Sequence, residues 1–492
     1  MVTWRAGLTV GALWVLSAAP VQGQPSETRV GPPKGTVIVV GGGAIGPEIY
    51  ARFIEAAGGP DALIIDVPTA GGDSVYPATW RGANPWRRAG ARNVVVLHTL
   101  DKAVANSDSV VALLTRAGGV WFEGGRQWRL ADAYLGTRME QGFHDVLARG
   151  GVVGGSSAGA SILSGYMLRG ARSGNTIIMA PDSDSGFNFL RGVAIDQHVV
   201  ARERLRDLAD SLLPHRPDLL GISEDEGTAW IIQGDTGVIM GRNKAFVYGG
   251  GENDAGKPFL TLFPGDRYDL AARRLIGRAA DGSGLSEAYL DSLMPNCGTT
   301  RCTVLVARNG KVLADKAWGI PAHPRYMPGT TVPNFPLGGL TAAFTGLGRQ
   351  LIPDSVTPGS TAYLRLLTQR IYTPIGARKT VLDTTGGTAR FESSVDELYR
   401  LELGLQHPGT WVRDTLAASS EAAVPVDPAR GWKRDTYRGT TRLSLFGAEN
   451  RKRAAWLRFP DRKVTVIILS DDERLEAGSI AERISDRVLT PP

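Results

Sequence analysis

Two adjacent serines stand between pairs of glycines in GGVVGGSSAGASILSGYM, residues 150–167. The apolar run before them predicts a strand and GASILSGYML after them predicts a helix, so the serines lie on a sharp strand-to-helix turn. The frame Gly-x-Ser-x-Gly is complete around Ser157 but not around Ser156. We therefore predict Ser157 as a nucleophile, with the backbone amide of Ala158 facing a developing oxyanion. The alternative is a structural turn in which either serine only caps a closely packed helix.

A nucleophilic serine needs a general base, and His198 follows a predicted strand end in AIDQHVVARERLRDL. Further along, GISEDEGTAWII places Glu224, Asp225 and Glu226 just before another apolar strand. One of these carboxylates could orient the imidazole and hold it in the correct tautomer. Because a lone histidine is usually structural and an acidic cluster is usually a solvated loop, these residues alone leave the chemistry open.

A different chemistry has to be weighed near the start of the chain. GGGAIG follows a predicted strand and matches the dinucleotide-binding pattern at Gly41, Gly43 and Gly46, with Asp66 downstream. Glycine is also favoured at any closely packed strand-to-helix turn. The pattern leaves a dinucleotide-dependent enzyme as an alternative to a serine hydrolase.

The elements that would position these residues indicate a parallel α/β fold. Residues 35–72 alternate a β-branched run, a glycine turn, an amphipathic helix and a second β-branched run, which is typical of a βαβ unit. Further buried strands are predicted at NVVVLHT, GVWFEGG, RGGVVGG and TAWIIQG. We predict a parallel-sheet α/β domain over residues 30–276, with function at the strand ends.

The pattern changes in the second half of the chain. A looser stretch over residues 277–296 predicts a linker. TVLVARNGKVLADKAWG and RAAWLRFPDRKVTVIILSDD then predict two antiparallel hairpins, which turn at Asn-Gly and around Pro-Asp. We predict a second domain over residues 297–492.

The first residues, 1–23, combine Arg5, a short apolar run and a small-residue end, which is typical of a secretory signal. The run is shorter than the roughly 20 residues of a spanning helix, so an uncleaved anchor is the lesser alternative. The two cysteines, Cys297 and Cys302, could pair in an oxidising compartment. We expect an exported protein, periplasmic or extracellular, without a stable membrane anchor.

The composition and net charge indicate which classes of partner the chain could bind. The chain has 492 residues, of which 42% are hydrophobic and 21% charged, as in a folded protein of two domains. The formal net charge is +6 without a basic run, which argues against a nucleic-acid partner and weakly favours an acidic substrate. The six histidines have no metal-ligand spacing, so we expect no metal.

GSSAGAS, DQHVVARERLR and EDEGTA, in this order, resemble the cyanophycinase and aspartyl-dipeptidase family of serine peptidases. FEGGRQ, VVGGG and DVPTAGG fit the same family, so the resemblance covers about residues 34–276. It implies a flavodoxin-like fold similar to class I glutamine amidotransferases. It also assigns the GGGAIG glycines to the family's own opening turn, which demotes the dinucleotide alternative.

The resemblance implies roles for individual residues. Ser157 becomes the nucleophile, His198 the base and Glu226 the third member of a triad, with Glu224 as a possible third member instead. Gly125 and Ala158 would supply the oxyanion hole, and the implied substrate-binding residues are Gln127, Asp196, Gln197, Arg202 and Arg204.

Two departures from the family pattern put the substrate in doubt. Arg126 stands where the family's Gly-Gly-Asp-Gln loop has aspartate, and Asp207 stands where cyanophycinase has a third arginine. The arginine pair could still clamp a substrate carboxylate. The family also makes a homodimer plausible.

ARNGKVLADKAWG, NFPLGGLTAAFTGL and RFESSVDELYRL resemble the serine β-lactamase and penicillin-binding family over about residues 300–490. In that family a helix start carries Ser-x-x-Lys, but here the two positions are Gly339 and Ala342. YRGTTRLSLFG also lacks the family's strand motif. We predict a degenerate, non-catalytic α+β accessory domain, with an unrelated α+β domain as the alternative.

Together these features predict an exported serine peptidase that hydrolyses amide bonds of aspartyl or β-aspartyl peptides, such as a cyanophycin-like polymer or its dipeptides. No cofactor is expected. The alternatives are a catalytically silent binding protein that acts through its C-terminal domain and a dinucleotide-binding enzyme.

Overall fold

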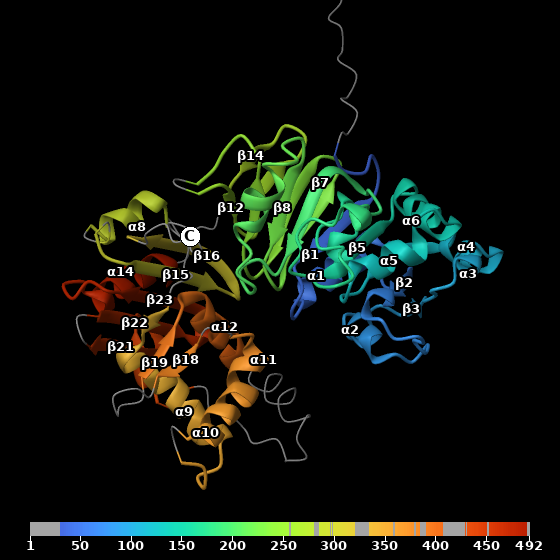
Figure 1. Cartoon of the computed structure of the whole chain (residues 1–492). Helices are drawn as coiled ribbons and strands as arrows, with labels where there is room; N and C mark the ends of the chain where they lie inside the picture. The colour runs from blue at the N-terminus through green and yellow to red at the C-terminus, as the bar shows by residue number, and fades with distance from the viewer. Residues whose placement is uncertain are drawn as a thin grey trace, which may run out of the picture.

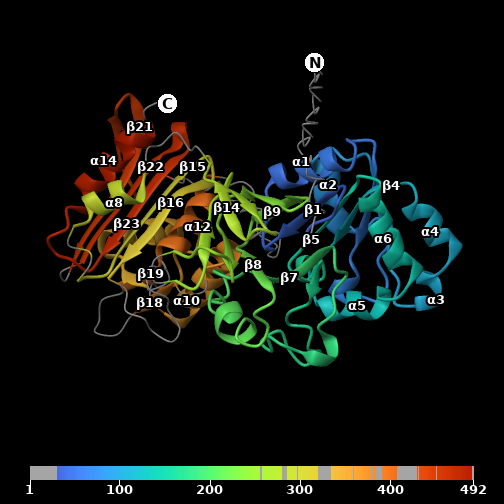
Figure 2. The ribbon, with the colours of Figure 1, turned by 90° about the horizontal axis from the view of Figure 1, so that it is seen from above.

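The chain forms two sheet-based domains that lie next to each other, coloured blue to green and yellow to red in Figure 1. Figure 2 shows the same pair from above. The predicted signal segment, residues 1–23, lies outside the described residues. The computed structural model describes residues 30–254, 257–279, 285–295, 297, 299–319, 334–357, 360–377, 380–383, 390–406, 429, 431–449 and 452–489.

The N-terminal domain is built on a nine-stranded mixed sheet. Its five strands on one side are parallel to one another, and the other four are antiparallel. In spatial order the strands are β14 (Arg274–Gly277), β13 (Arg267–Asp269), β10 (Thr236–Gly241), β9 (Thr228–Gln233), β1 (Thr36–Val40), β5 (Val152–Ser156), β4 (Ala117–Phe122), β2 (Leu63–Val67) and β3 (Asn93–Val96).

The predicted parallel sheet is right for β1 to β5 and wrong for TAWIIQG, which is β9 and runs antiparallel to β1. The preceding strand ends at Glu224, so only a short turn separates it from β9. That turn lies beside the end of β1, where the amide of Gly227 donates to the carbonyl of Gly42, so β9 begins at the edge where β1 ends and runs back along it. The α/β class stands, and the sheet is mixed.

Helices cover both faces of the parallel strands, which explains why β1 is apolar throughout. Val37 and Val39 pack in one hydrophobic cluster, whereas Ile38 and Val40 pack in another on the opposite face. Pro47 at the first turn of the first helix fits its missing amide donor. The helices are α1 (Pro47–Ala56), α2 (Asn84–Arg88), α3 (Lys102–Ala105), α4 (Asp108–Leu114), α5 (Gln127–Tyr134), α6 (Arg138–Ala148) and α7 (Ala158–Ser161).

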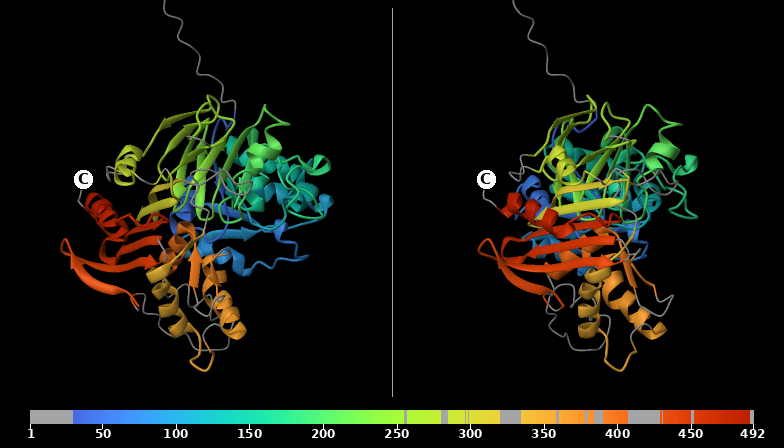
Figure 3. Two further views of the ribbon diagram at one scale, coloured as in Figure 1. Left: turned by 60° about the vertical axis from the view of Figure 1, so that its left-hand side comes forward. Right: turned by 90° about the vertical axis from the view of Figure 1, so that its left-hand side faces the viewer.

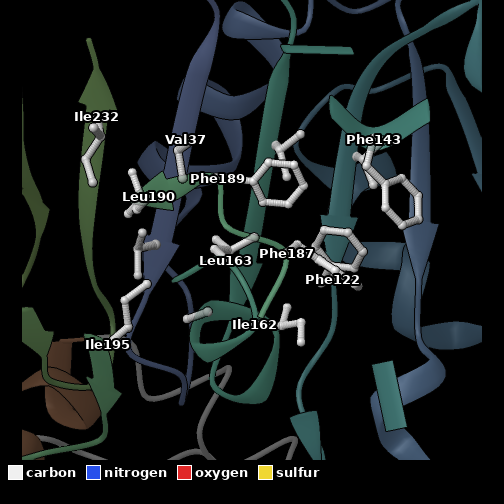
Figure 4. Packing of buried hydrophobic residues seen from close by; sticks show 14 of the residues in the cluster. Val37, Phe122, Phe143, Ile162, Leu163, Phe187, Phe189, Leu190, Ile195 and Ile232 are labelled. Atoms are coloured by element: carbon white, nitrogen blue, oxygen red, sulfur yellow. The ribbon is translucent and has the colours of Figure 1, made fainter. Parts of the chain in front are cut away.

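A second sheet of five strands packs on the first. In Figure 4, Phe187 lies against Phe122 of β4, and their ring centroids are 5.3 Å apart. Leu190 and Ile195 of the second sheet pack in the same hydrophobic cluster as these two rings. In spatial order the strands are β12 (Leu260–Leu262), β11 (Ala245–Tyr248), β8 (Leu220–Glu224), β7 (Leu190–Gln197) and β6 (Ser164–Tyr166).

The helix predicted for GASILSGYML is wrong after its first turn, because α7 ends at Ser161 and β6 follows. The carbonyls of Ile162 and Leu163 accept hydrogen bonds from the amides of Phe187 and Phe189. These tertiary bonds replace the helical ones that the local pattern favours.

The C-terminal domain is a six-stranded antiparallel sheet with helices on both faces (Figure 3). Both predicted hairpins are confirmed as β15–β16 and β22–β23. The strands are β16 (Lys311–Trp318), β15 (Cys302–Arg308), β23 (Val464–Ser470), β22 (Lys452–Phe459), β21 (Thr440–Glu449) and β20 (Lys433–Tyr437), and a small separate sheet contains β17 (Phe335–Pro336), β19 (Arg390–Ser393) and β18 (Val381–Asp383).

Alternate residues of β15 point to the two helical layers. Val304 and Val306 pack with one layer, and Leu305 and Ala307 pack with the other. The first layer contains α8 (Glu287–Leu293) and α14 (Ala477–Leu489), and the second contains α9 (Thr341–Leu351), α10 (Thr361–Leu367), α11 (Thr373–Ile375) and α12 (Val395–Gln406).

Helix α8 lies in the segment predicted as a linker, residues 277–296. Its Leu290 and Leu293 are buried in the C-terminal core. The C-terminal unit therefore starts before the predicted boundary at residue 297. No helix of the described ranges combines the length and the apolarity that a membrane span requires.

Cys297 and Cys302 form a disulfide, and both residues are fully buried. The bond closes a loop of only a few residues, which in the chain-entropy treatment stabilises the fold by about 2 kcal/mol.

We expect the Cys297→Ala, Cys302→Ala double variant to unfold about 4 to 8 °C below the wild type in differential scanning calorimetry. A reductant should lower the wild-type midpoint by a similar amount and leave that of the double variant unchanged. An equal effect of the reductant on both proteins would contradict this expectation.

Candidate active site

Ser157 directly follows β5, at the edge of the sheet where the parallel strands terminate. Its φ and ψ are 57° and −115°, a strained conformation for a residue with a side chain. Its amide donates to the carbonyl of Val40 at 3.0 Å, and its hydroxyl makes no helix-capping bond. This geometry favours a nucleophile elbow over the structural turn.

His198 follows β7 directly, as predicted, and faces Ser157. Its Nε2 lies 2.8 Å from Oγ of Ser157, and its Nδ1 lies 2.8 Å from Oε1 of Glu226. Its amide donates to the carbonyl of Gly41 at 3.1 Å, which ties it to the end of β1. With the proton on Nδ1, the ring donates to the carboxylate and accepts from the serine hydroxyl.

The structure places Glu226, and not Glu224, against the imidazole. Glu226 lies in the turn between β8 and β9, where the amide of Gly227 donates to the carbonyl of Gly42 at 2.9 Å. Glu224 points into the interior, and neither of its carboxyl oxygens has a hydrogen-bond partner among the described residues. Burial raises the pKa of Glu224 well above its usual range.

Opposing effects set the charges of this chain of hydrogen bonds. Burial alone would raise the pKa of Glu226, but the hydrogen bond from His198 and the charge of Arg400 lower it to about 2. Burial lowers the pKa of His198, against the opposing effect of its hydrogen bond to Glu226. Around neutral pH the site therefore holds an ionised carboxylate and a neutral imidazole that can accept a proton.

The GGGAIG glycines make room for these side chains. A Cβ on Gly42 would lie 2.2 Å from Cε1 of His198, and one on Gly43 would lie 2.7 Å from Cβ of Glu226. Asp66, the acidic residue of the dinucleotide pattern, is completely buried. The glycine pattern is thus explained by the packing of the chain on itself.

The two residues predicted for an oxyanion hole, Gly125 and Ala158, lie in two segments next to the serine. Ala158 begins α7, where the first amides of a helix have no partner within the helix. Gly124 and Gly125 follow β4, and a Cβ on Gly124 would lie 3.9 Å from Oγ of Ser157. The backbone at Gly125 has a φ of 143°, which a residue with a side chain rarely adopts.

Sequence comparisons decide the family. The model described as "Peptidase family S51" matches residues 37–240, a range that contains Ser157, His198 and Glu226. The cyanophycinase of Synechococcus elongatus is 32% identical over 225 residues, which are 44% of this chain and 68% of that protein. The chain belongs to peptidase family S51.

This S51 peptidase is accordingly a serine-type hydrolase. The cyanophycinase of Nostoc sp. (strain PCC 7120 / SAG 25.82 / UTEX 2576) is 31% identical over 224 residues, which are 44% of this chain and 74% of that protein. A crystal structure of a peptidase from an acI-B1 Actinobacterium is 23% identical, with a TM-score of 0.39 over 49% of this chain and 98% of that chain.

Three of the predicted substrate-binding residues of this S51 peptidase are buried and bonded within the protein. Gln127 donates from Nε2 to the carbonyl of Leu168 at 2.6 Å. Gln197 donates from Nε2 to Oγ of Ser161 at 3.3 Å. Asp196 is 1% exposed and accepts hydrogen bonds from Arg169. These contacts fix the three side chains within the N-terminal domain, and a direct role in substrate binding stays a prediction.

The other two, Arg202 and Arg204, line a cavity of about 720 Å³ between residues 169–178 and the segment that follows His198. Nη1 of Arg204 is buried without a hydrogen-bond partner among the described residues and lies 3.8 Å from Oδ1 of Asp196. Burial and the charge of Arg169 lower the pKa of Arg204 to about 10. The cavity therefore offers guanidinium groups that could receive a carboxylate.

Sequence reasoning missed Arg169, which lines the same cavity. Its Nη2 donates to Asp196 at 2.7 Å and to Asp207 at 2.6 Å. Asp207, which departs from the family pattern, thus has an arginine partner from a distant segment. No motif in the sequence marks Arg169.

No cluster of three or more histidine, cysteine, aspartate or glutamate side chains in the part of the chain that the structure describes has the arrangement of a metal site.

Proposed function

We propose that this S51 peptidase hydrolyses amide bonds through a triad of Ser157, His198 and Glu226. The observation that carries the proposal is the continuous chain of two 2.8 Å contacts from the serine hydroxyl through the imidazole to the carboxylate. The strained backbone at Ser157 supports it, because such strain persists where the surrounding structure enforces it.

In this mechanism Oγ of Ser157 attacks the amide carbonyl while Nε2 of His198 takes its proton. The amides of Gly125 and Ala158 stabilise the tetrahedral oxyanion. The carbon–nitrogen bond then breaks as His198 gives the proton to the leaving amine. A water molecule, deprotonated by the same imidazole, attacks the acyl-enzyme, and His198 gives that proton to Oγ of Ser157 as the ester bond breaks, which releases the acid and free Ser157. Glu226 stays ionised and stabilises the imidazolium in each step.

We propose an aspartyl or β-aspartyl peptide as the substrate. The relatives that match the N-terminal domain are named cyanophycinases. The cavity lined by Arg202 and Arg204 offers partners for a substrate carboxylate, as the sequence predicts.

The disulfide and the predicted signal segment support an exported, periplasmic or extracellular enzyme.

We propose a β-lactamase-like but catalytically silent C-terminal domain. Gly339, at the position of the expected nucleophile, lies in a 3₁₀ turn just before α9. A Cβ there would come within 2.0 Å of the carbonyl oxygen of Phe446. The backbone of β21 therefore leaves no room for a serine side chain at that position.

The experiment that tests the proposed function treats the full-length protein with a fluorophosphonate probe and locates the adduct by mass spectrometry. Cyanophycin, β-Asp-Arg and matched α-aspartyl peptides are assayed in parallel. We expect the adduct on Ser157 and turnover of at least one β-aspartyl compound. A folded protein that neither reacts with the probe nor cleaves any compound would instead be a binding protein on this scaffold.

A further inference from the structure

The C-terminal domain contributes a side chain to the surroundings of the proposed triad. Helix α12 lies on the side of that domain that faces the N-terminal domain (Figures 1 and 2). From this helix Nη1 of Arg400 donates to Oε2 of Glu226 at 3.1 Å. Because Oε1 of the same carboxylate faces Nδ1 of His198, Arg400 lies one residue beyond the triad in a single chain of hydrogen bonds.

The guanidinium of Arg400 holds two carboxylates at once. Its Nη2 donates to Oδ2 of Asp225 at 2.9 Å. The other oxygen of Asp225 accepts from the amide of Ala201 at 3.0 Å, three residues after His198. Arg400 thus braces both the acid of the triad and the loop that follows its base. A planar guanidinium can do this because its donors lie in a fixed fork.

The contact is buried, so it is not an ordinary surface ion pair. The side chain of Arg400 is 9% exposed, and those of Asp225 and Glu226 are 3% and 14% exposed. Burial alone would lower the pKa of Arg400, but the charges of Asp225, Glu226 and Asp396 raise it, which keeps the guanidinium charged. Such pairs are screened little by salt, and removal of one partner leaves the other charge uncompensated.

Other contacts hold the two domains in this arrangement. Lys244 pairs with Asp315 and, at 3.3 Å, with Asp396 on α12. Gly376, at the C-terminal end of α11, lies beside the carboxylate of Glu226. A Cβ on Gly376 would lie 3.7 Å from Oε2 of Glu226. The approach of the C-terminal domain to Glu226 therefore involves two of its helices.

We propose that Arg400 is a positioning residue for the triad, so that the docked C-terminal domain completes the active site of the N-terminal domain. The inference rests on the proposed function of Ser157, His198 and Glu226. It gives the accessory domain a role in catalysis that requires no nucleophile of its own.

The expected effect has a definite sign. The charges of Glu226 and Asp225 both raise the pKa of His198. Arg400 compensates these charges, so its loss should raise the pKa of His198. Because the base must be neutral to accept the serine proton, the acid limb of the pH–rate profile should move to higher pH. Without Arg400 the carboxylate of Glu226 is also positioned less precisely, which should lower the reaction rate at the plateau of the profile.

The test measures the rate constant of fluorophosphonate labelling across about pH 5 to 9, which needs no knowledge of the substrate. We expect Arg400→Gln to lower the plateau rate about tenfold or more and to move the acid limb upward by roughly half a pH unit or more. Arg400→Lys keeps the positive charge but cannot bond both carboxylates in the fixed geometry of a guanidinium. Relative to Arg400→Gln, it should therefore restore the position of the acid limb more fully than the plateau rate. Thermal unfolding verifies that each variant is folded.

Asp315→Asn is the matched control, because it weakens the Lys244 contact between the domains at a residue that contacts neither Arg400 nor Glu226. We expect its acid limb to coincide with that of the wild type. Failure of the wild type to label at Ser157 would refute the proposed function itself. Ser157-dependent labelling of the wild type, together with an Arg400→Gln variant that keeps both the plateau and the limb, would overturn only the role of Arg400. A lower plateau with an unmoved limb would also overturn it, because a purely structural role predicts that result.

Discussion

Replacement of Ser157 by alanine is expected to abolish fluorophosphonate labelling and to lower kcat/KM by about 10⁴-fold or more. Without Oγ no acyl-enzyme can form, and His198 has no hydroxyl to deprotonate. The fold should tolerate the change, because alanine meets the same backbone strain at a φ of 57° and the hydroxyl makes no capping bond. Turnover of the peptide that the wild type cleaves is the measurement, and circular dichroism verifies the fold.

Ser156→Ala is the matched control for this prediction. Ser156 is the last residue of β5 and is 6% exposed, so it is next to the nucleophile in the sequence but inside the sheet. Its loss should change kcat/KM by no more than a few fold. If Ser156→Ala were inactive and Ser157→Ala active, the frame of glycines would have been assigned to the wrong serine.

The parts of the site that could be predicted are those whose geometry is local. A serine at φ 57° needs small neighbours, and the glycines around Ser157 make this requirement visible in the sequence. His198 follows a strand end, and Glu226 stands in the turn before the next strand. Strand ends alone left the three residues as separate candidates, because β5 lies in one sheet and β7 and β8 lie in another. The family resemblance was needed to group them.

Direction and tertiary pairing were harder to predict. The apolar run of β9 is the same whether the strand runs parallel or antiparallel, and only the short connection from β8 decides between them. Helix α7 stops after one turn because the amides of Phe187 and Phe189 take the carbonyls that a longer helix would use. Such competition lies outside any local window.

The two missed arginines have the same explanation. Arg169 reaches Asp196 and Asp207, which lie 27 and 38 residues further along the chain. Arg400 reaches Glu226 across 174 residues and from another domain. In the sequence an arginine is typical of a solvated face, so its burial beside a distant carboxylate is visible only in the folded chain.

Glu226→Gln is expected to lower kcat/KM by about 10³- to 10⁴-fold, because it changes the tautomer of the base. The cationic Arg400 favours the amide oxygen of the new side chain, so the NH₂ group faces Nδ1 of His198. Nδ1 must then accept, which puts the ring proton on Nε2 and removes the acceptor that Ser157 needs. Loss of the carboxylate also removes the charge that stabilises the imidazolium.

Glu224→Gln distinguishes the two candidate acids. Burial raises the pKa of Glu224 well above its usual range and so favours the neutral carboxyl form, to which a glutamine is close in shape and charge. We expect kcat/KM and the labelling rate of this variant to stay within a few fold of the wild type. A larger loss in Glu224→Gln than in Glu226→Gln would transfer the third position of the triad to Glu224. It would also contradict the proposed positioning role of Arg400, because Arg400 contacts Glu226.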